Sequence, residues 1–192
     1  MKLLDHAIVF AVQAHEGMYR KNGKTPYIMH PMEVAAIVST LTDDEEIMAA
    51  AMMHDIVEDT PVTIDEIRAN FGSRVADLVG AETENKRTTA SPSETWRLRK
   101  EESLEVLRQT KDPGVKMMWL GDKLSNMRSF YRLYLEEGDG LWEHFNMKNV
   151  DQQKWYYQTI REYLSELKET PAWKELDTLI RFVFHESEET LS

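Results

Sequence analysis

Apolar residues recur at the spacing of an α-helix along almost the whole chain. In the first segment Leu3, Ala7 and Ala11 lie on one helix face, and a similar period returns in most later segments. The alternation of apolar and polar residues that marks a half-buried strand has no counterpart of useful length. The sequence therefore predicts an all-α protein, and its 192 residues suit a single domain over 1–192.

Capping residues and helix breakers divide this pattern into separate helices. Pro31 suits the start of one helix, Pro61 should end the helix before it, and Thr63 suits an N-cap. The polar segment 82–93 has no apolar period and is expected to be a long loop. The expected helices cover about 3–14, 32–41, 43–59, 63–72, 73–80, 94–109, 113–136, 148–169 and 172–185.

Composition excludes several classes of function. Lys plus Arg is 23 and Asp plus Glu is 34, so the formal net charge is −11, which disfavours nucleic acid and anionic membranes as partners. The chain has no cysteine, which excludes disulfides and thiolate chemistry and fits a cytoplasmic protein. The N-terminus lacks the features of a signal peptide, and no run approaches the ~20 apolar residues of a membrane span. A small anionic molecule remains a suitable ligand if basic residues converge locally.

The sharpest motif is HDIVED, residues 54–59, which lies late in an expected helix. Residues three or four apart share a helix face, so Asp55 is expected above Glu58 and Asp59, with His54 above Glu58. One turn then carries an imidazole and three carboxylates beside the apolar run AAAMM, which is unfavourable without a cation or water. This donor set suits Mn²⁺, Fe²⁺ or Zn²⁺. The alternative is a hydrogen-bonded core histidine and a solvated helix end.

Two further segments supply matching residues. YIMHP places His30 at the mouth of an expected helix, on its loop side, and GDKLSNM places Asp122 and Asn126 on one face of an apolar helix. A buried aspartate needs a partner, and a metal ion is a suitable one. Taken singly, His30 is more simply interpreted as an ordinary loop histidine, and Asp122 as a helix acid without function. Together with His54 and Asp55, they provide two His and two Asp and leave coordination positions for water and substrate.

The order H…HD…ED…D resembles that of the HD-superfamily phosphohydrolases. Three blocks, AHEGMYRKNGKTPYIMHPMEVAAIV, AAMMHDIVEDTPVTIDEIRANFGSRVADLV and VKMMWLGDKLSNMR, are similar to the hydrolase domain of the RelA/SpoT family and to its stand-alone relatives, the small alarmone hydrolases. The resemblance covers about residues 5–132 and implies an HD-domain helical bundle, with 133–186 as a helical C-terminal extension. A chain of this length is expected to be a stand-alone hydrolase.

The resemblance also implies a metal site and a reaction. The family's metal, usually Mn²⁺, would be held by His30, His54, Asp55 and Asp122. The acidic pair Glu58 and Asp59 would serve catalysis by positioning or deprotonating a water. The reaction of the family removes pyrophosphate from the 3′ position of guanosine tetra- or pentaphosphate.

The loop YRKNGK carries candidate residues for binding the nucleotide. An arginine can stack on a base and grip a phosphate, and a lysine offers a compact charge. From the resemblance we expect Arg20 to face the base, Lys21 and Lys86 to reach phosphates, and Asn126 with Ser129 to contact the sugar or the 3′ region. Without the HD motifs, the same loop would be interpreted as a solvated basic turn.

Two departures from the family pattern lie on the substrate side of the site. The family's Gly-Val-Thr-Lys or Gly-Val-Thr-x-Asp-Lys stretch reads GAETENK here, and its Leu-Ala-Asp reads Leu-Gly-Asp at 120–122. The aromatic residues at 155–157 are interpreted as part of the core.

The leading hypothesis for the function is 3′-pyrophosphohydrolysis of a guanosine alarmone. A phosphatase or pyrophosphatase for another phosphorylated nucleotide, and a catalytically silent nucleotide-binding module, remain alternatives. The sequence does not indicate the oligomeric state.

Overall fold

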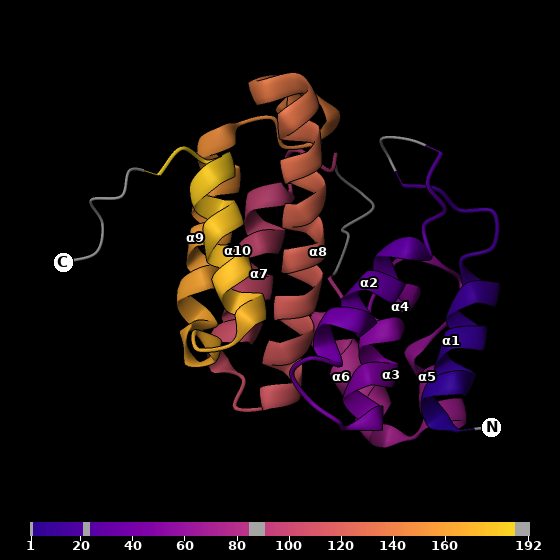
Figure 1. Ribbon diagram of the computed structural model, residues 1–192. Helices are drawn as coiled ribbons and strands as arrows, with labels where there is room; N and C mark the ends of the chain where they lie inside the picture. Colours follow the sequence, from indigo (N-terminus) through magenta and orange to yellow (C-terminus); the bar gives the residue numbers. More distant parts are fainter. Residues whose placement is uncertain (1, 21–23, 85–90, 187–192) are drawn as a thin grey trace.

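A computed structural model describes residues 2–20, 24–84 and 91–186 (Figure 1). Over these ranges the chain forms helices and loops, and the extended structure amounts to an isolated antiparallel bridge between Tyr19 and Pro26. The prediction of an all-α protein is therefore confirmed. Within the same ranges, no helix is long and apolar enough to cross a membrane.

The helices of the described ranges follow the expected order closely. They are α1 (Leu3–Ala14), α2 (Met29–Val38), α3 (Glu45–Met52), α4 (Ile56–Asp59), α5 (Ile64–Phe71), α6 (Ser73–Glu82), α7 (Trp96–Gln109), α8 (Pro113–Glu137), α9 (Val150–Tyr163) and α10 (Pro171–Val183), with 3₁₀ turns η1 (Gly138–His144) and η2 (Ser165–Leu167). The single helix expected over 148–169 is wrong, because α9 ends at Tyr163 and a separate 3₁₀ turn follows.

The helix expected over 43–59 is also wrong, and the break falls at the HD motif. Helix α3 ends at Met52 and α4 begins at Ile56. Between them, the Nδ1 atom of the buried His54 lies 2.9 Å from the carbonyl oxygen of Ala51. The histidine thereby hydrogen-bonds one of the carbonyls that the end of a helix leaves without a partner. The motif is consequently a turn between two helices, and the side chain of His54 helps to define it.

Two other helix bounds differ from the expectation and affect the site. Helix α2 begins at Met29, so His30 lies in its first turn and not on the loop before it. Pro31 is compatible with this position, because the first turn of a helix leaves its N–H groups unpaired in any case. Helix α6 continues to Glu82, so this residue ends a helix and does not open the expected loop.

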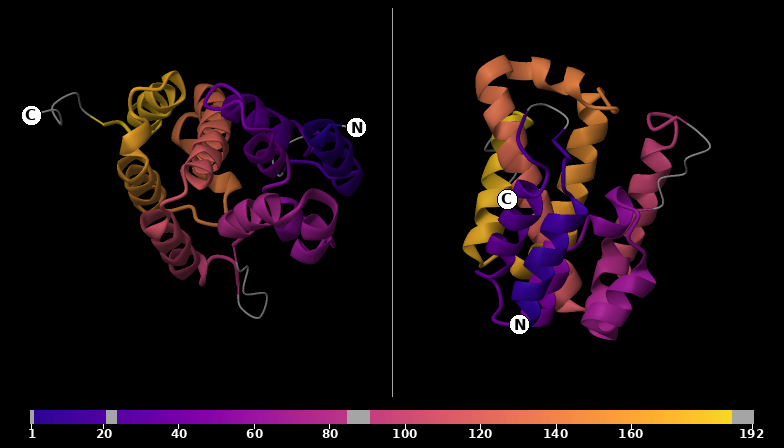
Figure 2. Two further views of the ribbon diagram at one scale, coloured as in Figure 1. Left: turned by 90° about the horizontal axis from the view of Figure 1, so that it is seen from below. Right: turned by 90° about the vertical axis from the view of Figure 1, so that its right-hand side faces the viewer.

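Helix α8 runs through the middle of the molecule (Figures 1 and 2). Its main partners are α2 on one side and α10 on the other, and it also contacts α3 and α6. Helices α7, α9 and α10 stand together on the far side of α8 from α1 and α5, as Figure 1 and the left view of Figure 2 show. Side chains from the middle of α8, including Trp119, Leu120 and Leu124, are buried. Polar residues on this segment therefore project into the interior.

The close approach of α8 to α2 depends on Gly121. A Cβ atom at this position would lie 2.9 Å from Cγ2 of Val38 and 3.2 Å from the backbone oxygen of Val34. Glycine lets the two helices pack without this conflict and sets the following residue, Asp122, against the first turn of α2. The aromatic cluster in the middle of α9 packs in the core as expected, because Tyr156 and Tyr157 are both buried.

Candidate metal centre

Three of the four predicted metal ligands converge in the interior. Side-chain donor atoms of His30, His54 and Asp122 all lie within 4.8 Å of one another, and the three residues are buried. The Nε2 atom of His30 lies 3.1 Å from Oδ1 of Asp122, and Nε2 of His54 lies 3.8 Å from the same oxygen. Helix α2, the turn after α3 and the middle of α8 each contribute one residue. Donors that are far apart in the sequence thus surround one point.

Asp55, the fourth predicted ligand, lies at the edge of this cluster. Its Oδ2 atom lies 3.1 Å from Nε2 of His54 and 3.5 Å from Nε2 of His30. The side chain of Asp55 is 19% exposed, whereas those of the other three residues are at most 8% exposed. Asp55 therefore lies on the more open side of the cluster.

A hydrogen-bond chain behind His30 sets the orientation of its ring. The Nδ1 atom of His30 lies 2.9 Å from the hydroxyl oxygen of Ser125, which donates to Oε2 of Glu33 at 2.6 Å. Because the Ser125 hydroxyl donates its proton to Glu33, its oxygen accepts a hydrogen bond from Nδ1–H of His30. The lone pair of His30 then resides on Nε2 and faces the cluster, as is usual for metal-binding histidines. Arg128 fixes Glu33 in turn, at 3.1 Å.

His54 provides the observation that tests whether a metal fits here. Its Nδ1 is bonded to the Ala51 carbonyl, so its other nitrogen, Nε2, is the one directed at the cluster. Within the described part of the chain, this buried Nε2 makes no well-aligned hydrogen bond, and its polar neighbours are Oδ2 of Asp55 at 3.1 Å and Oδ1 of Asp122 at 3.8 Å. A buried polar atom without a well-aligned hydrogen bond is rare and calls for an explanation. A divalent ion between Nε2 and the two aspartates would supply it, and the donor set of nitrogen and oxygen suits such an ion.

Electrostatics at the cluster favour a cation. Burial lowers the pKa of His30, as expected for an imidazole removed from water. For His54 burial acts in the same direction, but the Asp55 carboxylate outweighs it and raises the pKa to about 10. For Asp122 burial would raise the pKa, but Lys123 and the two histidines hold it well below its usual value. The buried Asp122 carboxylate is thus charged, with Asp55 beside it, and either a proton on His54 or a metal ion can compensate this charge.

The two predicted catalytic acids lie on the short helix α4 beside the cluster. The Oδ2 atom of Asp59 accepts a hydrogen bond from the Tyr27 hydroxyl at 2.6 Å. The same hydroxyl lies 2.7 Å from Oδ2 of Asp55. Glu58 accepts from the backbone N–H of Glu84 at 3.3 Å. Sequence reasoning missed Tyr27, although it lies three residues before His30 in YIMHP.

The predicted nucleotide-binding residues fall into three groups. Arg20 donates to Oδ1 of Asn126 at 3.1 Å, and the amide of Asn126 donates to Oδ1 of Asp122 at 2.6 Å, so these two residues join the metal cluster. Ser129 lies one turn further along α8, where its hydroxyl bonds the Ser125 carbonyl and the Arg132 guanidinium. Lys21 and Lys86 lie outside the described residues.

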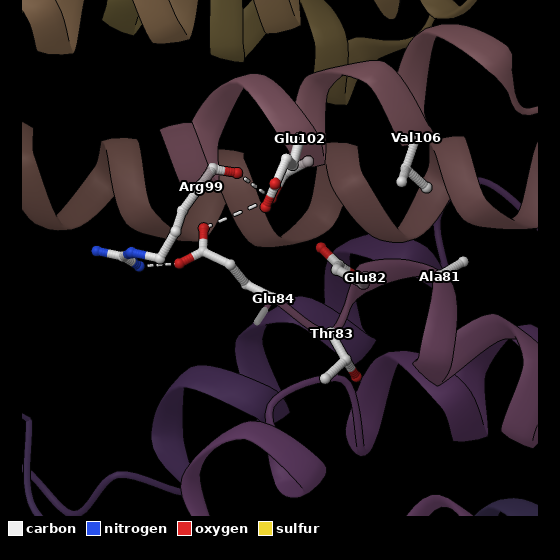
Figure 3. Close-up of a pocket in the computed structure, with 8 residues that line it drawn as sticks. Ala81, Glu82, Thr83, Glu84, Arg99, Glu102 and Val106 are labelled. Carbon is white, nitrogen blue, oxygen red and sulfur yellow. Dashed lines mark hydrogen bonds and ion pairs between the residues drawn. The ribbon is translucent and has the colours of Figure 1, made fainter. Parts of the chain in front are cut away.

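Two charged residues close to the cluster were not singled out from the sequence. The ammonium of Lys123 bonds Oδ2 of Asp122 and lies 4.7 Å from the centre of the Trp119 ring. Despite its burial, the pKa of Lys123 is raised well above its usual value by Asp122, so the ammonium is charged. Glu82, at the end of α6, has a buried carboxylate, and it borders a cavity of about 170 Å³ together with Arg99, Glu84 and Glu102 (Figure 3).

Comparison with known proteins places the chain in a family. Residues 7–146 match the family model described as HD domain. This match covers more than half of the chain, so the protein belongs to the HD domain family. The matched range includes each of the four predicted metal ligands and both predicted catalytic acids.

Among curated proteins, a similar one is the guanosine-3′,5′-bis(diphosphate) 3′-pyrophosphohydrolase of Haemophilus influenzae, which is 36% identical over 126 residues. The match covers 63% of this chain and 18% of that protein, so the chain spans less than a fifth of the length of this relative. The resemblance that the three sequence blocks show is thereby confirmed.

Two solved structures have the same fold. The Listeria monocytogenes protein lmo0812 is 35% identical, with a TM-score of 0.71 over 82% of this chain and 99% of that chain. A structure described as a metazoan ortholog of SpoT that hydrolyzes ppGpp has a TM-score of 0.75 and 24% identity, and it covers 95% of this chain and 96% of that one. At this lower identity, the second structure supports the fold alone.

Proposed function

We propose that this protein is a metal-dependent phosphohydrolase that removes pyrophosphate from the 3′ position of guanosine 3′,5′-bis(diphosphate). The observation that carries the proposal is the meeting of His30, His54 and Asp122, with Asp55 at the open edge. The name of the Haemophilus influenzae relative supports the choice of substrate. The HD domain match over residues 7–146 includes the whole candidate metal centre, which supports a role of this site in the reaction.

The proposed cofactor is one divalent ion, with Mn²⁺ as the first candidate. It would be held by the side chains of His30, His54, Asp55 and Asp122. Their nitrogen and oxygen donors are compatible with this ion. A divalent ion bound there would lower the pKa of a water and offset the charge of a phosphoryl group. The protein contributes the rigid placement, because the Ser125 hydroxyl and the Ala51 carbonyl fix the two imidazole rings.

The remaining polar residues divide the work between catalysis and binding. Glu58 and Asp59 lie beside the open edge of the cluster, where a carboxylate can orient or deprotonate the attacking water. Arg20 and Asn126 form a bonded pair next to Asp122 and would hold the nucleotide. Lys21 and Lys86 would bind its phosphates, and Ser129 its sugar. Phosphoryl transfer needs mainly such placement and compensation of charge.

Several broader expectations belong to the same proposal. The chain would form one HD domain over 1–192, with residues 133–186 as a helical extension that packs against α8. Its partner would be a small nucleotide, without nucleic acid or membrane, in the reducing environment of the cytoplasm. The buried contacts of α10 with α8 are consistent with an extension that belongs to the same folded unit.

A nucleotide panel assayed with Mn²⁺ tests the proposed function. The expected result is conversion of guanosine tetraphosphate to GDP and pyrophosphate, with no turnover by a matched Asp55→Asn variant. Release of single phosphates only, or indifference to the 3′-diphosphate group, would assign the protein to the phosphatases of other nucleotides. Tight nucleotide binding by the Mn²⁺-loaded protein without any product would identify a silent binding module.

A further inference from the structure

The carboxylate of Glu84 is held by two basic side chains of α7. Nζ of Lys100 donates to its Oε2 at 2.7 Å. The Arg99 guanidinium is bonded to the other oxygen, Oε1, as the dashed line in Figure 3 marks. The side chains of Glu84 and Arg99 are only 9% and 10% exposed. Two cations thus compensate one carboxylate that is nearly removed from water, and we call Arg99 and Lys100 the α7 clamp.

Arg99 is itself fixed by further hydrogen bonds. Its Nε donates to the Thr95 hydroxyl oxygen at 3.2 Å, and a terminal nitrogen donates to the Pro92 carbonyl at 3.1 Å. The planar guanidinium therefore uses each of its three nitrogens on a different partner. Because these directions are set together, the clamp holds the Glu84 carboxylate at a defined place against the start of α7.

The backbone of Glu84 reaches a different part of the molecule. Thr83, the residue before it, has extended backbone angles, and its N–H makes a last helical bond of α6, to the Val79 carbonyl at 3.1 Å. The next N–H, that of Glu84, donates to Oε2 of Glu58 at 3.3 Å. Glu84 is thus bonded to α7 through its side chain and to a proposed catalytic acid on α4 through its backbone.

Glu58 gains orientation from this backbone donor. A glutamate side chain has several rotatable bonds, so its carboxylate has one orientation only where fixed partners hold it. A hydrogen bond from an N–H group to a carboxylate is stronger than one to a neutral oxygen. Placement matters for catalysis, since a displacement of about 1 Å can lower a rate about 100-fold.

We propose that Glu84 is a positioning residue of the reaction: the α7 clamp holds its carboxylate, and its backbone N–H thereby keeps Glu58 in one orientation. This inference rests on the proposed function, in which Glu58 orients or deprotonates the attacking water. Within the described residues, the hydrogen bonds of Glu84 join it to Glu58 and to α7, and not to the four proposed metal ligands. Loss of the clamp should therefore affect turnover and leave metal binding intact.

The first test is steady-state kinetics of the whole Mn²⁺-loaded protein with guanosine tetraphosphate. For Glu84→Gln and for Arg99→Met we expect kcat to fall about 10- to 100-fold, the upper end being the cost of a displacement of about 1 Å. KM and Mn²⁺ affinity should stay near their wild-type values. Arg74→Met is the control, because it breaks the ion pair with Asp112 at the other end of α6 and should keep the wild-type kcat. An unchanged kcat in Glu84→Gln would overturn the proposal, as would a loss confined to KM, which would make the clamp a substrate-binding group.

A double-variant cycle separates positioning from a general structural role. In the Glu58→Gln background, the carboxylate that Glu84 would orient is already absent. Addition of Glu84→Gln should then change kcat by less than about twofold, although each single variant is impaired. Two losses that multiply would show that Glu84 acts at another place, and this result would overturn the proposal even if both variants fold normally.

Hydrogen exchange of the Glu84 amide, measured by nuclear magnetic resonance without metal or nucleotide, tests the contact itself. We expect Glu58→Ala and Arg99→Met each to speed exchange at this amide about 10-fold or more, with Arg74→Met as the unchanged control. Wild-type exchange in both variants would overturn the proposal. A wild-type protein in which the amide behaves as expected, but which does not hydrolyse the nucleotide, would overturn the proposed function alone.

Discussion

The hydroxyl oxygen of Tyr27 lies 2.6 Å from Oδ2 of Asp59. It also lies 2.7 Å from Oδ2 of Asp55, so one hydroxyl connects a proposed metal ligand with a proposed catalytic acid. A phenol has a single proton and donates to one of the two carboxylates at a time. Burial and both carboxylates raise the pKa of Tyr27, so the hydroxyl keeps its proton. The ring stacks on His15 at 5.1 Å, which holds the hydroxyl in place.

Tyr27→Phe should lower turnover while the metal stays bound. The variant keeps the ring and its stacking but removes the donor that positions Asp59. We expect kcat to fall about 10- to 100-fold, as is typical when a group behind an active residue is lost. The measurement is steady-state kinetics together with Mn²⁺ content. Tyr19→Phe, at an exposed position of the same loop, is the control. A Tyr27→Phe variant with wild-type kcat would show that Asp59 needs no such support.

Removal of a proposed metal ligand should abolish metal retention. His54→Ala and Asp55→Ala each remove one proposed metal ligand. The charged groups of the cluster that remain then lack one of their partners. We expect both variants to lose bound metal and activity, and elemental analysis after dialysis measures the first effect directly. His144→Ala, which changes an exposed histidine on η1, should retain the wild-type content. If both ligand variants keep one ion per chain, the assignment of this centre is wrong.

Loss of the acidic pair on α4 should separate binding from catalysis. In the double variant Glu58→Gln and Asp59→Asn, the four metal ligands remain, so we expect Mn²⁺ and nucleotide binding to persist. Turnover should fall by about 10²–10⁴-fold, the usual loss when general acid–base help is removed. Single-turnover kinetics on the loaded protein, with a parallel binding measurement, distinguish the two effects. Near-normal turnover would exclude both acids from the mechanism.

The meeting of His30, His54 and Asp122 could be predicted from the sequence because their three motifs, taken together, supply a matching set of donors. His54 and Asp55 are adjacent, and Asp122 interrupts an apolar helix. The sequence alone therefore shows that these polar side chains need a compensating partner. The break between α3 and α4 could not be predicted, because apolar periodicity continues through it. What ends α3 there is a bond from the His54 side chain to a carbonyl, which depends on the burial of that residue.

The groups behind the ligands were missed for a different reason. Ser125 and Glu33 come from two helices, and their link to His30 exists only after α8 has packed on α2. Glu82 was assigned to a polar loop, because the sequence around it lacks an apolar period. In the structure α6 continues to Glu82 and carries its carboxylate inward. Such contacts depend on tertiary packing, which the composition of one segment does not determine.

Arg20 should contribute mainly to substrate affinity. Its guanidinium is bonded to Asn126 next to the metal cluster and lies 5.7 Å from the centre of the Tyr27 ring. We expect Arg20→Met to raise KM more than it lowers kcat, if the arginine holds ground state and transition state alike. Lys24→Met removes a positive charge from the same loop at an exposed position and serves as control. A loss confined to kcat would instead place Arg20 at the reacting phosphoryl group.

Glu84 should make the stability of the protein depend on pH. Its carboxylate is bonded to the guanidinium of Arg99 and to Nζ of Lys100, the latter at 2.7 Å. Burial raises the pKa of Glu84, but Lys100 and Arg99 outweigh burial and hold it below the usual value. Folding therefore favours the ionised form. The resulting stabilisation is fully present above the unfolded-state pKa of about 4.3 and is lost as pH falls through the lower folded-state pKa.

We accordingly expect Glu84→Gln to reduce the free energy of unfolding by about 1.5–3 kcal/mol at pH 7, the range for hydrogen bonds to charged groups. The difference from wild type should shrink as pH falls below about 4. Denaturant unfolding with a chelator present, repeated over this pH range, measures it without interference from bound metal. Glu101→Gln changes an exposed pair with Arg97 and should cost less than about 0.5 kcal/mol. A loss in Glu84→Gln that is equal at all pH values would mean that the packing of Glu84, and not its charge, stabilises the fold.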